Sequence, residues 1–241
     1  MTDPSPAGAR AALVLLAAGS GTRAGRADNK VFVSLSGRPV FAWSLLRAAR
    51  VEEIVRTVMV VRDTDRAVAH AALDREEPAR DVHLVTGGST RHESEWAALQ
   101  HLAPDIHAGR INVVVVHDAA RPLATSATFR DVITTALSNG GAIPVRDQPD
   151  LLPLDQAHPL RSRGDLVSVQ TPQAFRAEPL LAAYTAARAD GFTGTDTSSC
   201  FERYAGLDVV CLPGAAGNIK ITYAEDLLLA ERLIGGSTQR S

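Results

Sequence analysis

The feature that most constrains how this chain can fold is the alternation of short apolar runs with longer amphipathic segments. The runs at residues 12–17, 57–61 and 111–116 have the length of strands, and longer amphipathic segments alternate with such runs along the chain. This alternation is typical of βαβ units around a parallel sheet. We therefore predict an α/β fold with a mostly parallel sheet and helices on both of its faces.

The same patterns predict where the other elements lie. Further strands are expected at residues 82–85, 141–145, 167–170, 207–212 and 218–222. Helices are expected at residues 39–50, 89–102, 126–138, 178–189 and 224–233. We expect one domain over residues 1–241, with a disordered start at 1–10. The alternation stops at about 146–166, where turn-forming residues and the lack of a helical period predict a protruding arm.

Composition narrows the classes of protein that fit. A formal net charge of -2 gives no basic surface field, so nucleic-acid binding is not expected. No apolar run approaches the roughly 20 residues of a membrane span, and the polar N-terminus has no signal-peptide pattern. The only cysteines, Cys200 and Cys211, form neither a disulfide framework nor a metal site. We expect a cytoplasmic protein that binds no membrane.

The glycine-rich loop GSGTRAG follows the first apolar run. Glycines let the backbone approach a ligand closely, and the amide groups of such a loop can bind phosphate. A plain strand-to-helix turn is one alternative, and a dinucleotide fingerprint is another, because Gly19, Gly21 and Ala24 have its spacing. The cations Arg23 and Lys30 favour a triphosphate, since they can stabilise the charge that develops at the α-phosphorus.

His117 and Asp118 come directly after the most apolar run, at residues 111–116. Ligands of open α/β sheets bind outside the carboxyl ends of strands. An aspartate there can hold Mg²⁺ that bridges triphosphate oxygens, and Arg121 can pair with a phosphate. The alternative role for Asp118 is a turn cap. We interpret His117 as a residue whose hydrogen bonds are satisfied at the strand end.

Three other residues carry weaker signals. Lys220 lies in the apolar run 218–222, where either an anionic ligand or exposure on an edge strand would avoid the cost of burying a charge. Asp196 either caps the following helix or joins the site. Cys200 has no electropositive setting, so we interpret it as a small buried residue.

Six segments occur in an order that points to a known family. They are LAAGSGTRAG with Lys30, GGSTRHES (87–94), VVHDAARPL (115–123), VSVQTPQAF (167–175), GTDTS (194–198) and NIKITYAEDLLLAE (218–231). From about Leu13 to Leu233 the chain resembles the 2-C-methyl-D-erythritol 4-phosphate cytidylyltransferase family of the non-mevalonate isoprenoid pathway. The motifs HDAARP, TPQ and NIKIT-x-x-EDL are specific as a set.

The resemblance implies a Rossmann-like nucleotidyltransferase fold of the glycosyltransferase-A kind and a homodimer whose arms clasp each other. It also implies a Mg²⁺-dependent reaction between CTP and a small polyol phosphate. In that reaction the phosphate of 2-C-methyl-D-erythritol 4-phosphate attacks CTP in line and displaces pyrophosphate.

The resemblance further implies roles for individual residues. Those that would contact the nucleotide are Ala17, Ala18, Gly19, Gly21, Gly87, Gly88 and Ser94. The catalytic set would be Arg23, Lys30, Lys220 and Asp118, with Asp118 also as the metal ligand. Those that would contact the acceptor are Arg121, Thr171 and Arg163, the last reaching across the dimer from the arm.

The chain departs from the family pattern in both halves of the expected site. Leu16, Ala24 and Asn29 stand where the family usually has Pro, Met and Pro. At the base of the arm, residues 145–150 read VRDQPD, where the family usually has a Thr that contacts the acceptor and then a Lys. A carboxylate near a phosphate acceptor is unfavourable by about 1 kcal/mol or more.

These departures leave several alternatives open. One is a cytidylyltransferase for another polyol phosphate, such as ribitol 5-phosphate. Another is a catalytically weak paralogue that binds a nucleotide, although the catalytic cations argue against it because a sensor needs only affinity. A sugar-1-phosphate or molybdopterin nucleotidyltransferase and a dehydrogenase are more distant alternatives.

Overall fold

The computed structural model describes residues 8–19, 29–76, 81–148, 167–194 and 196–238. Its main sheet has the strand order β10-β7-β9-β6-β1-β4-β5, with β8 paired to β7. The strands are β1 (Ala11–Leu16), β4 (Ile54–Val61), β5 (Val82–Thr86), β6 (Val113–Asp118), β7 (Gly140–Asp147), β8 (Val167–Val169), β9 (Gln173–Arg176) and β10 (Asp208–Pro213). Only β8 and β9 run antiparallel to their neighbours in the described part of this sheet. A separate small hairpin pairs β2 (Ser34–Leu35) with β3 (Arg38–Pro39).

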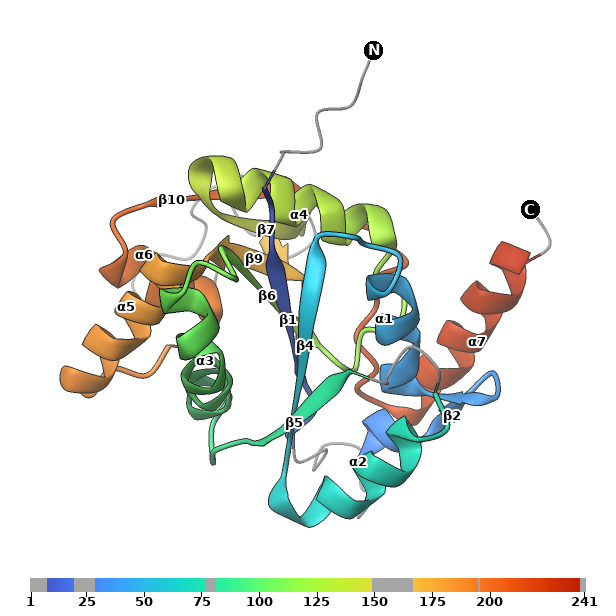
Figure 1. Ribbon diagram of the computed structural model, residues 1–241. Coiled ribbons are helices and arrows are strands. Elements are labelled where there is room, and N and C mark those ends of the chain that lie inside the picture. Colours follow the sequence, from blue (N-terminus) through green and yellow to red (C-terminus); the bar gives the residue numbers. More distant parts are fainter. Residues whose placement is uncertain (1–7, 20–28, 77–80, 149–166, 195, 239–241) are drawn as a thin grey trace, which may run out of the picture.

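Helices cover both faces of the sheet (Figure 1). On one face lie α1 (Val40–Ala48), α2 (Arg66–Leu73) and α4 (Ser126–Asn139). On the other lie α3 (Arg91–His107), α5 (Ala177–Ala189) and α6 (Thr197–Tyr204). The 3-10 helices are η2 (Lys30–Phe32) and η3 (Asp63–Asp65), and α7 (Ala224–Thr238) packs on the β2–β3 hairpin. The predicted α/β fold is confirmed.

The central strands are buried on both faces, which explains their unbroken apolar runs. Every residue of β6 is buried. In β1, Leu13 and Leu15 point to the face covered by α1, whereas Val14 points to the face covered by α3. Parallel strands between two helical layers have this composition, and the alternation follows the strand period of two.

The order of the strands reverses next to β1. From β1 the chain crosses through α1 to β4 and continues to β5 on one side, and then returns through α3 to β6 on the other side. Ligands of open α/β sheets bind outside the carboxyl ends of the strands at such a reversal. The fold therefore places the residues that follow β1 and β6 at the expected binding edge.

β7 and β8 form the base of the expected arm. Their antiparallel pairing sets Arg146 opposite Ser168, and Gln148 Nε2 donates to Ser168 Oγ at 3.0 Å. The chain therefore leaves and re-enters the sheet at neighbouring points. The body of the arm at 149–166 lies outside the described residues, so its shape, like the division into one domain with an arm, stays a prediction.

The strand expected at residues 218–222 is wrong. Asn218 N donates to the Ala215 carbonyl at 3.1 Å and Ile221 N donates to the Ala120 carbonyl at 2.8 Å, so the backbone bonds are those of a turn and a tether. The apolar side chains of this segment pack in the small cluster under α7 instead of in the sheet. Sequence reasoning also missed α2, β9 and the β2–β3 hairpin, whose strands are too short to show a period.

Within the described residues, no helix combines the length and the apolar character that crossing a membrane requires.

Candidate active site

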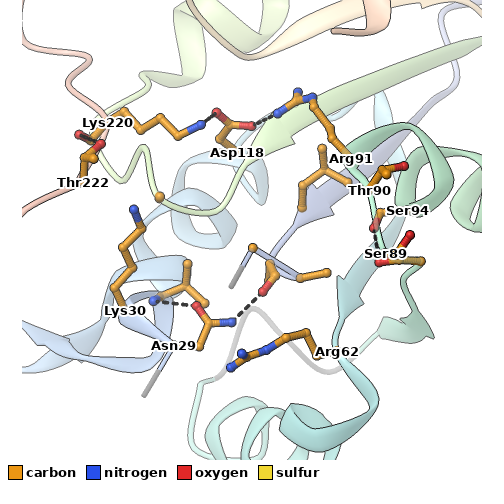
Figure 2. Close-up of a pocket in the computed structure, with 17 residues that line it drawn as sticks. Asn29, Lys30, Arg62, Ser89, Thr90, Arg91, Ser94, Asp118, Lys220 and Thr222 are labelled. Carbon is orange, nitrogen blue, oxygen red and sulfur yellow. Dashed lines mark hydrogen bonds and ion pairs between the residues drawn. The ribbon is translucent and has the colours of Figure 1, made fainter. Parts of the chain in front are cut away.

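A cavity of about 600 Å³ opens at the carboxyl ends of β1, β4, β5 and β6 (Figure 2). Its described lining residues are Leu16, Ala17, Ala18, Gly19, Asn29, Lys30, Val31, Arg62, Gly88, Ser89, Thr90, Arg91, Ser94, Asp118, Ala120, Lys220 and Thr222. Among them four side chains are cationic and one, Asp118, is acidic. A concave site with this excess of positive charge suits a polyanionic ligand.

Lys30 and Lys220 are the only lysines of the chain, in which every other strongly basic side chain is arginine. Both line the cavity. Lysine carries a compact point charge, whereas arginine presents a wide planar fork, and the two are not interchangeable where geometry matters. The placement of both lysines in one cavity therefore points to a task that needs an ammonium group.

Asn29 ties the start of η2 to the end of β1. Its amide nitrogen donates to the Ala17 carbonyl at 2.7 Å and to the Asp65 carboxylate at 2.9 Å. Asp65 also accepts from Arg62 Nε at 2.7 Å. These bonds fix the backbone from which Lys30 extends toward the side of the cavity that holds Lys220 (Figure 2).

The turn between β5 and α3 is closely packed, and two glycines allow it. A Cβ on Gly88 would lie 2.3 Å from the Glu93 Cβ, and a Cβ on Gly87 would lie 2.7 Å from the Ser94 Oγ. Thr90 caps α3, because its hydroxyl accepts from Glu93 N at 3.1 Å while the Glu93 carboxylate accepts from Thr90 N at 3.2 Å. This capping box fixes the turn as one wall of the cavity.

Asp118 lies at the end of β6 between three cations. Arg91 Nη1 donates to its Oδ1 at 2.5 Å and Lys220 Nζ donates to its Oδ2 at 2.7 Å, while Arg121 Nε lies 3.8 Å from Oδ2. Burial raises the pKa of Asp118, but Arg91 and Lys220 outweigh it and hold the pKa well below its ordinary value. The carboxylate is therefore ionised at any physiological pH.

Arg91 is held from behind by a second carboxylate. Its Nε donates to Glu95 Oε1 at 2.8 Å, one helical turn along α3. Burial lowers the pKa of Arg91, but Asp118 and Glu95 together raise it above its ordinary value. The guanidinium therefore stays charged at the cavity wall.

His117 and Thr171 form a layer behind Asp118. Thr171 Oγ1 accepts from Asp118 N at 3.0 Å and lies 3.0 Å from His117 Nδ1. His117 Nε2 lies 3.1 Å from the Arg121 carbonyl, which only accepts, so Nε2 carries the proton and Nδ1 accepts from the Thr171 hydroxyl. Burial lowers the pKa of His117 to about 4, so the ring is neutral. The interpretation of His117 as a satisfied strand-end residue is confirmed.

Arg121 and Lys220 are linked through the irregular segment 218–222. Arg121 Nη1 donates to the Asn218 carbonyl at 2.8 Å, and Asn218 Nδ2 donates to the Thr171 carbonyl at 2.9 Å. These bonds hold the segment beside β6 and set the Lys220 ammonium at the cavity. In the described structure Arg121 thus organises the wall around the site.

The structure brings most of the predicted site residues together. Those that line the cavity are Ala17, Ala18, Gly19, Gly88, Ser94, Lys30, Asp118 and Lys220. Those that lie behind its described wall are Gly87, Arg121 and Thr171. Those that lie outside the described residues are Gly21, Arg23 and Arg163. The chemical roles assigned to all of them stay predictions.

Sequence reasoning did not assign six polar residues of the cavity to the site, namely Asn29, Arg62, Ser89, Thr90, Arg91 and Thr222. Arg62 directly follows β4, and that position at a strand's carboxyl end was an available signal. Arg91 begins α3, where a cation opposes the helix dipole, so its placement was a second signal. No sequence pattern predicts the contact of Asn29 with the end of β1.

Two weaker signals have structural explanations. Asp196 caps α6, because its Oδ1 accepts from Ser199 N at 3.0 Å. Cys200 is fully buried, and burial raises the pKa of its thiol to about 12. Cys200 is thus a core residue, as expected.

Asp118 fits the way proteins hold Mg²⁺ next to phosphates. Such sites use one or two carboxylates and complete the coordination with water and phosphate oxygens. Asp118 is the one acidic side chain among the described lining residues, and it stands at the strand end with both oxygens turned to cations.

Comparison with known proteins agrees with this geometry. The family model of 2-C-methyl-D-erythritol 4-phosphate cytidylyltransferase matches residues 11–235. The protein of that name from Bacillus cytotoxicus is 32% identical over 225 residues, which cover 92% of this chain and 96% of the relative. The one from Aquifex aeolicus is 36% identical over 224 residues, with the same shares covered.

Solved structures of similar fold support the assignment. The 4-diphosphocytidyl-2C-methyl-D-erythritol synthase of Anaerococcus prevotii superposes with a TM-score of 0.81 at 26% identity, covering 97% of this chain and 100% of the other. The similarity therefore extends over both the sequence and the whole described fold. The chain belongs to the 2-C-methyl-D-erythritol 4-phosphate cytidylyltransferase family.

Proposed function

We propose that this chain is an enzyme that transfers a cytidylyl group from CTP to 2-C-methyl-D-erythritol 4-phosphate and releases pyrophosphate. The observation that carries the proposal is the cavity at the carboxyl edge of the sheet, where cationic side chains surround the strand-end carboxylate of Asp118. The family model covers nearly the whole chain, and the relatives carry the name of this activity.

Charge complementarity explains the binding of a nucleoside triphosphate. Lys30, Arg62, Arg91 and Lys220 line the cavity and offset the charge of the phosphates. The backbone around Gly19 and the Gly88 turn lets a ligand approach the main chain closely. Mg²⁺, which we propose as the cofactor, would be held by Asp118 and would neutralise phosphate charge when bound.

The reaction is a displacement at the α-phosphorus of CTP. The acceptor phosphate forms a P–O bond on one side while the bond to the leaving pyrophosphate breaks on the other. Negative charge grows on the oxygens around the phosphorus, and Lys30 and Lys220 act as preorganised cations there. Arg23 is assigned to the same task by the family resemblance.

The acceptor side of the site depends on a second copy of the chain in this proposal. Arg163 reaches across a homodimer to the acceptor phosphate, and Arg121 and Thr171 shape the wall beside Asp118. The family resemblance and the antiparallel base of the arm at β7 and β8 support this arrangement. We also propose a cytoplasmic location, where CTP is available.

The test is pyrophosphate release in the presence of CTP and Mg²⁺. Reactions with 2-C-methyl-D-erythritol 4-phosphate, with ribitol 5-phosphate and with no acceptor are compared. We expect turnover with the first acceptor and background rates in the other two. Turnover with ribitol 5-phosphate alone would assign a different acceptor, and no turnover with either would leave a nucleotide-binding paralogue.

A further inference from the structure

A buried glutamate lies directly behind the cavity, on the apolar face of α3. Glu95 shares this face with Ala98, Leu99 and Leu102, all of which pack in the core between α3 and α5. The side chain of Glu95 is 2% exposed. An apolar residue would be the usual choice at such a position, because burying an ion pair seldom stabilises a fold more than an apolar residue of similar volume does.

Three donors from three helices converge on the Glu95 carboxylate. Arg91 Nε donates to Oε1 at 2.8 Å and Thr197 Oγ1, from α6, donates to the same oxygen at 2.8 Å. The Tyr184 hydroxyl, from α5, donates to Oε2. Tyr184 is itself fixed by stacking on His92, with ring centroids 4.5 Å apart. The carboxylate is thus held in one position by the core.

This arrangement orients the guanidinium of Arg91. Its Nε donates back to Glu95. Its Nη1 donates forward to Asp118 at the cavity, a contact that Figure 2 shows. A planar guanidinium bonded at one edge presents its remaining edge in a defined direction. Burial raises the pKa of Glu95, while Arg91 and the hydroxyl groups of Tyr184 and Thr197 oppose that rise. In its ionised form Glu95 supplies a counter-charge that stays with Arg91 when Asp118 turns to another partner.

We propose that Arg91 binds a phosphate group of the nucleotide and that Glu95, held by Tyr184 and Thr197, is the positioning residue that aims Arg91 into the cavity. The inference rests on the proposed function, since it names a contact for the triphosphate. A buried residue of α3 would thus contribute to nucleotide affinity, although Glu95 is not among the described residues that line the cavity.

The test is a double-mutant cycle on Glu95→Gln and Arg91→Ala, with kcat and KM for CTP and with CTP affinity from direct titration. We expect Glu95→Gln alone to weaken CTP binding and lower kcat/KM about tenfold, the effect of loosening one charge-assisted contact. In the Arg91→Ala background, Glu95→Gln should alter CTP affinity and kcat/KM by less than about twofold, because the effects of two contacting residues are coupled.

Glu76→Gln is the matched control. Glu76 is also buried and also pairs with one arginine, Arg38, but neither residue is among the described residues of the cavity. Loss of the Glu76 carboxylate should lower the melting temperature of the protein and leave its affinity for CTP unchanged. Where Glu95→Gln does not fold, Tyr184→Phe removes one donor to the carboxylate and should weaken CTP binding about threefold.

Equal losses of CTP affinity from Glu95→Gln with and without Arg91 would overturn the inference, as would a loss no larger than in the Glu76 control. These outcomes differ from a failure of the proposed function. In that case the unmodified chain would release no pyrophosphate with any acceptor, and the binding titrations would still decide the role of Glu95.

Discussion

Asp118 and the two lysines illustrate how single residues set the charge of this site. Asp118 is ionised because Arg91 and Lys220 donate to its two oxygens, although burial alone would favour the neutral acid. In the proposed function the same cations pair with the triphosphate, so ligand binding would exchange one set of ion pairs for another. Lys30 completes the set from the opposite side, at the start of η2.

Removing either lysine should impair chemistry more than folding. We expect Lys30→Ala and Lys220→Ala each to lower kcat by at least ~10²-fold, the scale for losing one preorganised electrostatic group. Lys30→Arg and Lys220→Arg should recover only part of the rate, because a wide fork replaces a point charge. Steady-state kinetics with CTP measures this, and full recovery by arginine would show that only charge matters.

The two cysteines should differ in reactivity. Burial raises the pKa of the Cys200 thiol to about 12, so almost no thiolate forms at pH 8, whereas Cys211 is exposed. In the native protein we expect a thiol reagent to modify Cys211 alone, and in denaturant to modify both. Cys211→Ser serves as the control, since it should leave no rapidly reacting thiol. Fast modification of native Cys200 would contradict its core position.

At the scale of elements, the junction of β5 with α3 both lines the proposed nucleotide site and caps a helix. Gly88 contacts Glu93, and Glu93 completes the capping box with Thr90. The first residue of this helix is Arg91, and the next turn carries Glu95. One helix start therefore positions both the backbone wall of the cavity and one of its cations.

A methyl group at this junction should disturb both roles. Gly88→Ala would place a Cβ 2.3 Å from the Glu93 Cβ, so the turn must shift. We expect a loss of about 1–3 kcal/mol in the free energy of unfolding and a rise in KM for CTP of about tenfold. Gly235→Ala in α7 is the control, because its Cβ meets nothing within 4 Å. Equal CTP binding by the two variants would show that the turn at Gly88 has no part in binding CTP.

At the scale of the whole molecule, the sheet brings distant segments to one edge. β1, β4, β5 and β6 end beside one another, and the segment 218–222 is tethered there although it belongs to no strand. The chain leaves the sheet after β7 and returns in β8, which pairs antiparallel with β7. The proposed dimer would add residues from a second copy through this excursion.

Complementation tests the shared site. Lys30→Ala and Arg163→Ala disable opposite sides of it, so each variant alone should be weak. In random 1:1 dimers of the two, about a quarter of all sites combine an intact Lys30 with an intact Arg163 from the other copy. We expect pyrophosphate release to rise toward that fraction after unfolding and refolding the mixture. A mixture no more active than its components would show that each chain completes its own site.

The sequence by itself determined the fold class and the place of the site. The apolar run at 111–116 indicates a central parallel strand, because such strands are buried on both faces. The glycine-rich loop, Asp118 and the two lysines were recognisable because their local patterns and family motifs are contiguous in the chain.

Only the tertiary structure decided which of these residues meet and what surrounds them. The segment 218–222 reads as a strand, yet its backbone bonds go to Ala215 and Ala120, which periodicity cannot reveal. Arg91 and Lys220, which both donate to Asp118, lie 27 and 102 residues from it in the sequence. Thr197 and Glu95, which are also hydrogen-bonded, are 102 residues apart. Local sequence patterns carry no information on contacts between residues so far apart in the chain, because the packing of the helices against the sheet creates those contacts.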